Sequence, residues 1–192
     1  MAEIIPYSPR YYKVPKRLAD VPSAWGPNES LLMDLIERFK IPTHTALEFG
    51  VDYGYSTSAL ANFFDEVVGV DHFNSDSQTG YRENLYEQAS TALKDFPNVR
   101  LIRQDFRQYI AENDQHYDLI HIDIFHDYST TYEAGWWAVN HANTVLFHDT
   151  ERYFEVKRAI STLADEAEMK FYNYPVNCGL GILVRTASLL SE

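Results

Sequence analysis

The chain has one cysteine, Cys178, among its 192 residues, so it contains no pair of thiols for an internal disulfide. This excludes the small secreted scaffolds that disulfides hold together, and it is compatible with a reducing compartment. The sequence also lacks an apolar run of about eighteen residues, and it lacks a basic N-terminal segment followed by an apolar stretch. We therefore expect a cytoplasmic protein without a membrane partner.

Positive charge is scarce. Sixteen lysines and arginines face 28 acidic residues, which gives a formal net charge of −12. Such a balance opposes binding to a phosphate backbone, so nucleic acid is not an expected partner. The basic cluster of Arg10, Lys13, Lys16 and Arg17 lies in a proline-rich N-terminal segment, where a solvated surface is sufficient explanation.

Glycine is also sparse, with eight residues, but two glycines follow an expected buried strand at Thr45–Phe49. The segment reads Glu48-Phe49-Gly50-Val51-Asp52-Tyr53-Gly54-Tyr55-Ser56. Both glycines permit positive φ and close backbone approach, and Ser56 is expected to cap the next helix and leave its first amides to face a ligand. The spacing differs from the G-x-G-x-x-G of dinucleotide sites, which disfavours an NAD-dependent oxidoreductase, and no G-K-[ST] follows.

This segment resembles the first motif of S-adenosylmethionine-dependent methyltransferases, in particular the catechol and caffeoyl-CoA O-methyltransferase branch. In that family the glycine turn holds the methionine part of the cofactor. The resemblance implies cofactor contacts from the motif residues Glu48, Phe49, Gly50, Tyr53, Gly54 and Ser56. The alternative is an ordinary strand-to-helix turn of another α/β protein.

Acidic residues follow the next two expected strands. Asp71 ends the strand Glu66–Val70, where a carboxylate can accept hydrogen bonds from both ribose hydroxyls, and the alternative is a helix cap. The strand Val99–Arg103 precedes Asp105 and Phe106, where the family contacts adenine through a polar group and an apolar face. For Asp105 a simple helix cap is equally open. The resemblance adds His72, beside Asp71, and Asp123, after the fourth expected strand, to the expected cofactor contacts.

Strand and helix patterns alternate along the chain, which is typical of a parallel sheet covered on both faces. We predict an α/β, Rossmann-like, doubly wound sheet of seven mostly parallel strands with an antiparallel strand from a terminal hairpin. Further strands are expected at Tyr117–Ile122, Thr144–Phe147, Lys170–Tyr174 and Gly181–Arg185. Helices are expected at Asn28–Phe39 (capped by Asn28), Ser56–Phe64, Gly80–Leu93, Phe106–Asn113, Thr130–Asn140 and Tyr153–Ala167.

Residues 1–27 are predicted to form an irregular arm rich in proline and aromatic side chains, ahead of a single domain at residues 28–192. The arm either covers the active site or clasps a partner subunit, and a disordered start is the alternative. Its aromatic residues are compatible with a homodimer.

Two further segments are expected at the carboxyl edge of the sheet, where open α/β sheets bind ligands. They contain Asp123, His126 and Tyr128 in a D-x-x-H-x-Y pattern, and Phe147-His148-Asp149-Thr150. This combination resembles a bacterial group of small O-methyltransferases that modify sugar or polyketide hydroxyls. In that group, acids at these two strand ends hold a divalent cation, usually Mg²⁺.

Methyl transfer to an alcohol needs an in-line approach and removal of the hydroxyl proton. Asp123 and Asp149 are suitable ligands for a hard cation that lowers the hydroxyl pKa, and His126 is suited to be the general base. Thr150 stands where the family has an amide or acid ligand, so the metal requirement is open. The alternatives are helix caps for the two aspartates and a surface position for His126.

His148 is expected to support or pack against the site, His121 to be a satisfied residue of the sheet, and Trp136 and Trp137 to serve in core and interface. The sequence therefore predicts an S-adenosylmethionine-dependent O-methyltransferase with a small-molecule acceptor. A methyltransferase-like binding module without activity, and an N-methylating enzyme that needs no metal, are the alternatives. The acceptor is expected to be chosen by the arm, by Phe73–Tyr81 and by the loop after His126.

Overall fold

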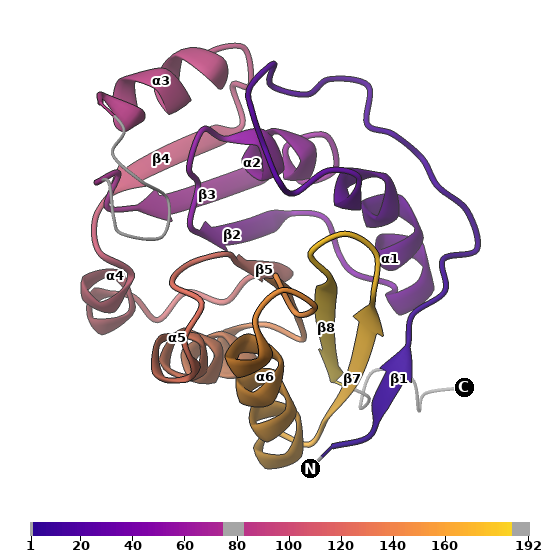
Figure 1. The fold of residues 1–192 in the computed structure, drawn as a ribbon. Coiled ribbons are helices and arrows are strands. Elements are labelled where there is room, and N and C mark those ends of the chain that lie inside the picture. Colours follow the sequence, from indigo (N-terminus) through magenta and orange to yellow (C-terminus); the bar gives the residue numbers. More distant parts are fainter. Residues whose placement is uncertain (1, 75–82, 186–192) are drawn as a thin grey trace.

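The computed structural model describes residues 2–74 and 83–185. They form one twisted sheet flanked by helices, with strand order β1-β7-β8-β6-β5-β2-β3-β4 (Figure 1). Within it, β2, β3, β4, β5 and β6 pair in parallel, and β8 lies antiparallel between β6 and β7. The expected α/β class, with its antiparallel terminal hairpin, is confirmed.

The seven predicted strands are present. They are β2 (Thr45–Phe49), β3 (Glu66–Asp71), β4 (Val99–Arg103), β5 (Leu119–Ile122), β6 (Thr144–His148), β7 (Met169–Tyr174) and β8 (Leu180–Arg185). Strand β5 begins later than predicted, because Tyr117 makes only an isolated bridge with Ala142. Apolar runs locate these strands well because parallel strands covered on both faces are apolar on both sides.

The helices are η1 (Asn28–Leu31, a 3₁₀ turn), α1 (Leu32–Phe39), α2 (Tyr55–Leu60), α3 (Leu85–Ala92), α4 (Phe106–Glu112), α5 (Tyr128–His141) and α6 (Phe154–Glu166). Helix α2 is shorter than predicted. The expected start of α3 at Gly80 lies outside the described residues. Asn28 does not cap a helix, since it lies inside the 3₁₀ turn with its side-chain amide buried and without a hydrogen-bond partner.

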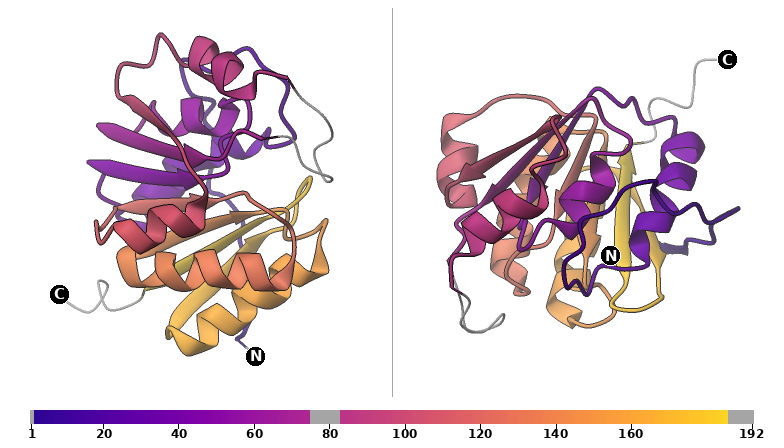
Figure 2. Two further views of the ribbon diagram at one scale, coloured as in Figure 1. Left: turned by 90° about the vertical axis from the view of Figure 1, so that its left-hand side faces the viewer. Right: turned by 90° about the horizontal axis from the view of Figure 1, so that it is seen from above.

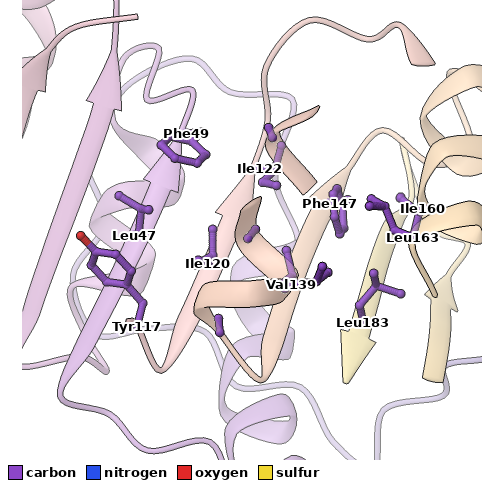
Figure 3. Close-up of a cluster of buried hydrophobic side chains, with 14 of the residues drawn as sticks. Leu47, Phe49, Tyr117, Ile120, Ile122, Val139, Phe147, Ile160, Leu163 and Leu183 are labelled. Carbon is purple, nitrogen blue, oxygen red and sulfur yellow. The ribbon is translucent and has the colours of Figure 1, made fainter. Parts of the chain in front are cut away.

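Two apolar clusters cover the two faces of the sheet. Helices α4, α5 and α6 cover one face, and Figure 2 shows α5 and α6 side by side there. Side chains such as Phe49, Ile120, Val139 and Leu163 interdigitate between sheet and helices (Figure 3). Helices α1 and α2 cover the opposite face together with Tyr7 and Trp25 of the arm. The sheet is thus buried on both faces, and its carboxyl edge is left for ligands.

The N-terminal arm is ordered along the described residues, contrary to the disordered alternative. It also contains an eighth strand that the sequence did not predict, β1 (Ile4–Pro6), which pairs in parallel with β7. From this edge the arm crosses the α1 and α2 face, where Ala19 donates its amide to Ser58. Among the described residues, no helix is long and apolar enough to cross a membrane.

Candidate functional site

A cavity of about 360 Å³ opens at the carboxyl ends of β2, β3, β4, β5 and β6. Its size falls within the range of roughly 300–1,000 Å³ that is usual for small-molecule sites. The expected site residues among its lining are Gly50, Tyr53, Ser56, Asp71, His72, Asp105, Phe106, Asp123, His126 and Asp149. Ten residues from five separate loops therefore meet at one place, as the sequence predicted.

The glycine turn after β2 forms the floor of this cavity. Gly50 has φ 90° and Gly54 has φ 93°, and the Gly54 amide donates to the Val51 carbonyl at 2.8 Å. A Cβ atom on Gly50 would lie 1.8 Å from the backbone oxygen of Asp123. The loops after β2 and β5 are thus so close that only glycine fits between them. The predicted cap is wrong in one detail: Gly54 occupies the N-cap position of α2, and Ser56 lies in its first turn.

Asp71 ends β3 and ties the glycine turn to that strand. Its Oδ2 accepts the backbone amides of Val51 (2.9 Å) and Asp52 (3.0 Å), and its Oδ1 accepts that of Phe73 (2.7 Å). It does not cap a helix, because α3 begins only at Leu85. Since a carboxylate has about four acceptor positions, one remains for a ligand hydroxyl in the cavity.

On the next strand end, the helix cap expected as the alternative for Asp105 is confirmed, and the residue also lines the cavity. Its Oδ1 accepts the amide of Arg107 at 2.8 Å and so caps α4, while the residue also lines the cavity beside Phe106. His72 lines the cavity as well, and its Nδ1 accepts the backbone amide of Asn74 at 2.9 Å. A polar group and an apolar ring therefore stand together in the cavity lining.

Three residues of the first motif are not part of the cavity lining. Phe49 is fully buried in the core, and Gly54 shapes the turn from behind. Glu48 is fully buried, and its carboxylate accepts a hydrogen bond from the Thr57 hydroxyl and pairs with His121 Nδ1 at 2.8 Å. The structure thus places Glu48 beneath the turn as a support, not as a group that faces a ligand.

This buried network extends to the arm. The Trp25 indole donates to His121 Nε2 at 3.1 Å, so the proton of the imidazole is on Nδ1, which donates to Glu48. His121 is therefore the satisfied sheet residue that the sequence predicted. Trp25 also lines the cavity, together with Pro22, Ser23 and Ala24. Of the two roles expected for an ordered arm, the structure supports the cover over the site.

The opposite wall of the cavity holds four groups that we call the imidazole–carboxylate cluster: Asp123, His126, His148 and Asp149. His126 Nε2 lies 2.7 Å from Asp149 Oδ2 and 3.6 Å from Asp123 Oδ1. His148 Nδ1 lies 3.1 Å from Asp123 Oδ2 and 3.6 Å from Asp149 Oδ2. Two strand ends thus bring two carboxylates and two imidazoles into direct contact.

The capping alternatives for the two aspartates do not hold. Helix α5 is capped by the side chain of Asp127, which accepts the Thr130 amide, and α6 has Tyr153 at its N-cap position. Asp149 has φ 65°, in the left-handed region, which aspartate and asparagine adopt more readily than most residues other than glycine. Its side chain is held in the cluster by this backbone.

The cluster changes the protonation of His126. Burial favours the neutral ring, but the hydrogen bonds and negative charges of Asp123 and Asp149 outweigh it and raise the pKa of His126 to about 9. In the same way, the carboxylates raise the pKa of His148 despite its burial, while the imidazoles hold the pKa of Asp123 well below its usual range although burial opposes this. With this raised pKa, His126 carries a proton at neutral pH, so it can act as a base only after it has lost that proton.

The expected third metal ligand, Thr150, lies outside the cavity lining. It is buried, and its hydroxyl donates to Asn173 Oδ1 at 2.6 Å. His148 was expected only to support the site, and Arg152 and Tyr153 were not expected in it, yet all three residues line the cavity. The Tyr153 ring stacks on His126 at 4.3 Å between centroids. The sequence does contain a signal for Tyr153, because this residue lies four positions after Asp149 and directly before an amphipathic segment.

Comparison with known proteins places the chain in a family. A family model described as "Methyltransferase domain" matches residues 47–150, which is more than half of the chain. This match spans β2 to β6 and thus both walls of the cavity. No curated protein matches the chain significantly.

Solved structures share the fold at low identity. An O-methyltransferase from Bacillus cereus in complex with S-adenosylhomocysteine has a TM-score of 0.65 and 16% identity, over 87% of this chain and 83% of that one. The O-methyltransferase TomG from Streptomyces achromogenes, solved with S-adenosylmethionine, has a TM-score of 0.64 and 16% identity, over 87% of this chain and 82% of that one. The amino pentose methyltransferase CalS10 from Micromonospora echinaspora has a TM-score of 0.63 and 12% identity, over 85% of this chain and 92% of that one. The motif, the strand order and the family match agree, and the chain belongs to the methyltransferase domain family.

Proposed function

We propose that this protein is an S-adenosylmethionine-dependent methyltransferase that methylates a hydroxyl of a small molecule. The observation that carries the proposal is the two-sided cavity. The glycine turn, Asp71 and Phe106 line one side, and the imidazole–carboxylate cluster lines the other. One side is suited to a nucleoside, and the other to moving a proton.

The chain's residues fit the cofactor that the family implies. The glycine turn lets the backbone approach a ligand closely, and the remaining acceptor position of Asp71 suits one ribose hydroxyl. Asp105 and Phe106 offer a polar group and a ring for the base. When bound, S-adenosylmethionine supplies a methyl group on a sulfonium, ready for in-line transfer.

The protein's own part is to orient the acceptor and accept its proton. His126, once it has lost its proton, can accept the acceptor's hydroxyl proton, and the stacked Tyr153 ring holds the imidazole in place. Asp123 supports His148 from the other side at 3.1 Å. Because His126 is protonated at neutral pH, the reaction is expected to accelerate as the pH rises toward 9.

The binding partners of the chain are proposed on its cavity, its charge and its arm. A small acceptor suits a cavity of about 360 Å³, and the net charge of −12 disfavours nucleic acid. A homodimer through the arm is a proposal that rests on exposed residues such as Tyr12, since Tyr7 and Trp25 are buried in their own chain. Of the segments expected to choose the acceptor, residues 75–81 lie outside the described residues.

The test is calorimetric titration of the purified chain with S-adenosylmethionine and with S-adenosylhomocysteine. We expect one molecule of either compound to bind per chain, and a screen of hydroxylated small molecules then follows with S-adenosylhomocysteine formation as the readout. Absence of binding would contradict the proposal and favour a binding module that has kept only the fold. A comparison with NAD in the same titration tests the oxidoreductase alternative, for which no binding is expected.

A further inference from the structure

The charged side chains of the cavity differ between its two sides. Three carboxylates line it along the ends of β2, β3 and β4, namely those of Asp52, Asp71 and Asp105. A cofactor whose sulfonium is positively charged suits that side. On the other side, each carboxylate of the imidazole–carboxylate cluster already has an imidazole within ion-pair distance. The further charge on that side is the guanidinium of Arg152.

Arg152 is a cation that the cavity offers to a ligand. Of the described residues that line the cavity, it alone is a lysine or arginine, and it is exposed. Its guanidinium lies over the Tyr153 ring, with 5.5 Å from Cζ to the ring centroid, and beside the Cys178 thiol. Neither neighbour is a carboxylate. Because a guanidinium keeps its charge throughout the physiological pH range, it stays available to an anion that enters the cavity.

The turn that leads into α6 places this guanidinium beside the reacting groups. The backbone amides of Arg152 (3.2 Å) and Tyr153 (3.0 Å) both donate to the Asp149 carbonyl. The Tyr153 ring, over which the guanidinium lies, also stacks on His126 at 4.3 Å between centroids. The proton acceptor and the cation therefore pack against the same ring, so one small molecule can reach both.

We propose that the acceptor carries a carboxylate besides its hydroxyl, and that Arg152 binds this carboxylate and thereby selects the acceptor. The inference rests on the proposed function, since it concerns the acceptor of that reaction. A planar guanidinium can donate to both oxygens of a carboxylate at once, which fixes the direction of the bound molecule as well as its distance. With its carboxylate held there, the acceptor presents its hydroxyl to His126.

The charge of the anion also follows from the lining. One guanidinium matches the single charge of a carboxylate, whereas a phosphate dianion would call for a second cation of this kind, and none of the described lining residues supplies another lysine or arginine. The chain as a whole has a net charge of −12 and repels anions at long range. A local cation is therefore what an acidic acceptor needs in order to bind here.

Arg158 offers a comparison within the same helix. Its Cζ lies 4.3 Å from the centroid of the Tyr128 ring, much as Arg152 lies over Tyr153. Unlike Arg152, it is paired with a carboxylate, that of Glu155 at 2.7 Å, and it is not part of the cavity lining. Arg158 is thus a matched control for the loss of one arginine and one ring contact.

The experiment measures charge selectivity in the full chain saturated with S-adenosylhomocysteine. The probes are the ortho, meta and para hydroxybenzoates and gluconate, each compared with its uncharged amide by calorimetric titration. We expect at least one carboxylate to bind about tenfold or more tightly than its amide. Arg152→Gln should remove this preference, and Arg152→Lys, which keeps the charge, should retain part of it. Arg158→Gln should bind the probes as the unchanged chain does.

Carboxylates that bind no better than their amides would overturn the proposal, and so would a preference that survives in Arg152→Gln. Equal weakening of a carboxylate and its amide in Arg152→Gln would also overturn it, because the residue would then only support the Tyr153 ring. Thermal unfolding shows that each variant is folded. Failure of the unchanged chain to bind S-adenosylhomocysteine would be a failure of the proposed function, whereas its binding without any preference for carboxylates would be a failure of this inference alone.

Discussion

Asp71→Ala should damage both the fold and the cofactor site, because one carboxylate serves both. The substitution removes the acceptor for three backbone amides, those of Val51, Asp52 and Phe73. Hydrogen bonds to a charged group are worth about 1.5–3 kcal/mol each, but neighbouring bonds do not add fully, and water can reach the partly exposed site. We expect a loss of about 2–4 kcal/mol in the free energy of unfolding.

The assay is urea unfolding, with and without S-adenosylhomocysteine, together with calorimetric titration of the ligand. Asp127→Ala is the control, since it removes one helix cap, at the Thr130 amide, and its residue is not in the cavity lining. The control should lose about 1 kcal/mol and keep its ligand affinity. An unfolding midpoint for Asp71→Ala equal to that of the unchanged chain would refute the role of the three bonds. Unchanged ligand affinity would place the ribose contact elsewhere.

Three further outcomes are expected. Gly50→Ala should be far more destabilising than Gly54→Ala in thermal unfolding, because its Cβ would meet backbone at 1.8 Å, whereas at Gly54 it meets the movable Leu93 side chain at 2.7 Å. In the metal-free protein, NMR should show His126 titrating near pH 9. The stability that its raised pKa contributes is then fully present below about pH 6.5 and is lost as the pH rises through about 9. Titration near pH 6.5 would contradict the ion pairing. Trp25→Phe should leave the buried Nε2 of His121 unpaired, cost about 1–3 kcal/mol in urea unfolding and expose the arm to proteolysis; a stability equal to that of the unchanged chain would show that this bond does not hold the arm.

The sequence was most informative where contacts are local or repetitive. Strands β2 and β4 begin and end at the predicted residues, because the residue pattern of a short run such as Thr45–Phe49 itself shows where the strand starts and stops. The five loops that line the cavity were also located, since the carboxyl ends of parallel strands lie along one edge.

What the sequence could not predict depends on distant partners. Strand β1 exists only because β7 offers an edge, and no local pattern in Ile4–Pro6 reveals this. Glu48 was expected to face the cofactor, yet it lies beneath the turn, where it pairs with His121 on the neighbouring strand β5. The high pKa of His126 follows from two carboxylates on separate strand ends, so its cause is visible only in three dimensions.

The pairing of β1 with β7 has a consequence for how the chain matures on the ribosome. Ile4 pairs with Phe171, so the strand Ile4–Pro6 has no partner until the segment that holds Phe171 has also been synthesised. At rates of roughly 5–20 residues per second, that wait is on the order of ten to thirty seconds. The arm that continues from β1 carries Pro22–Trp25 over the cavity, and until β7 is made this arm lacks its anchor at the edge of the sheet. A nascent chain would thus expose an open, partly built pocket, and early arrival of its ligand would favour completion of the fold.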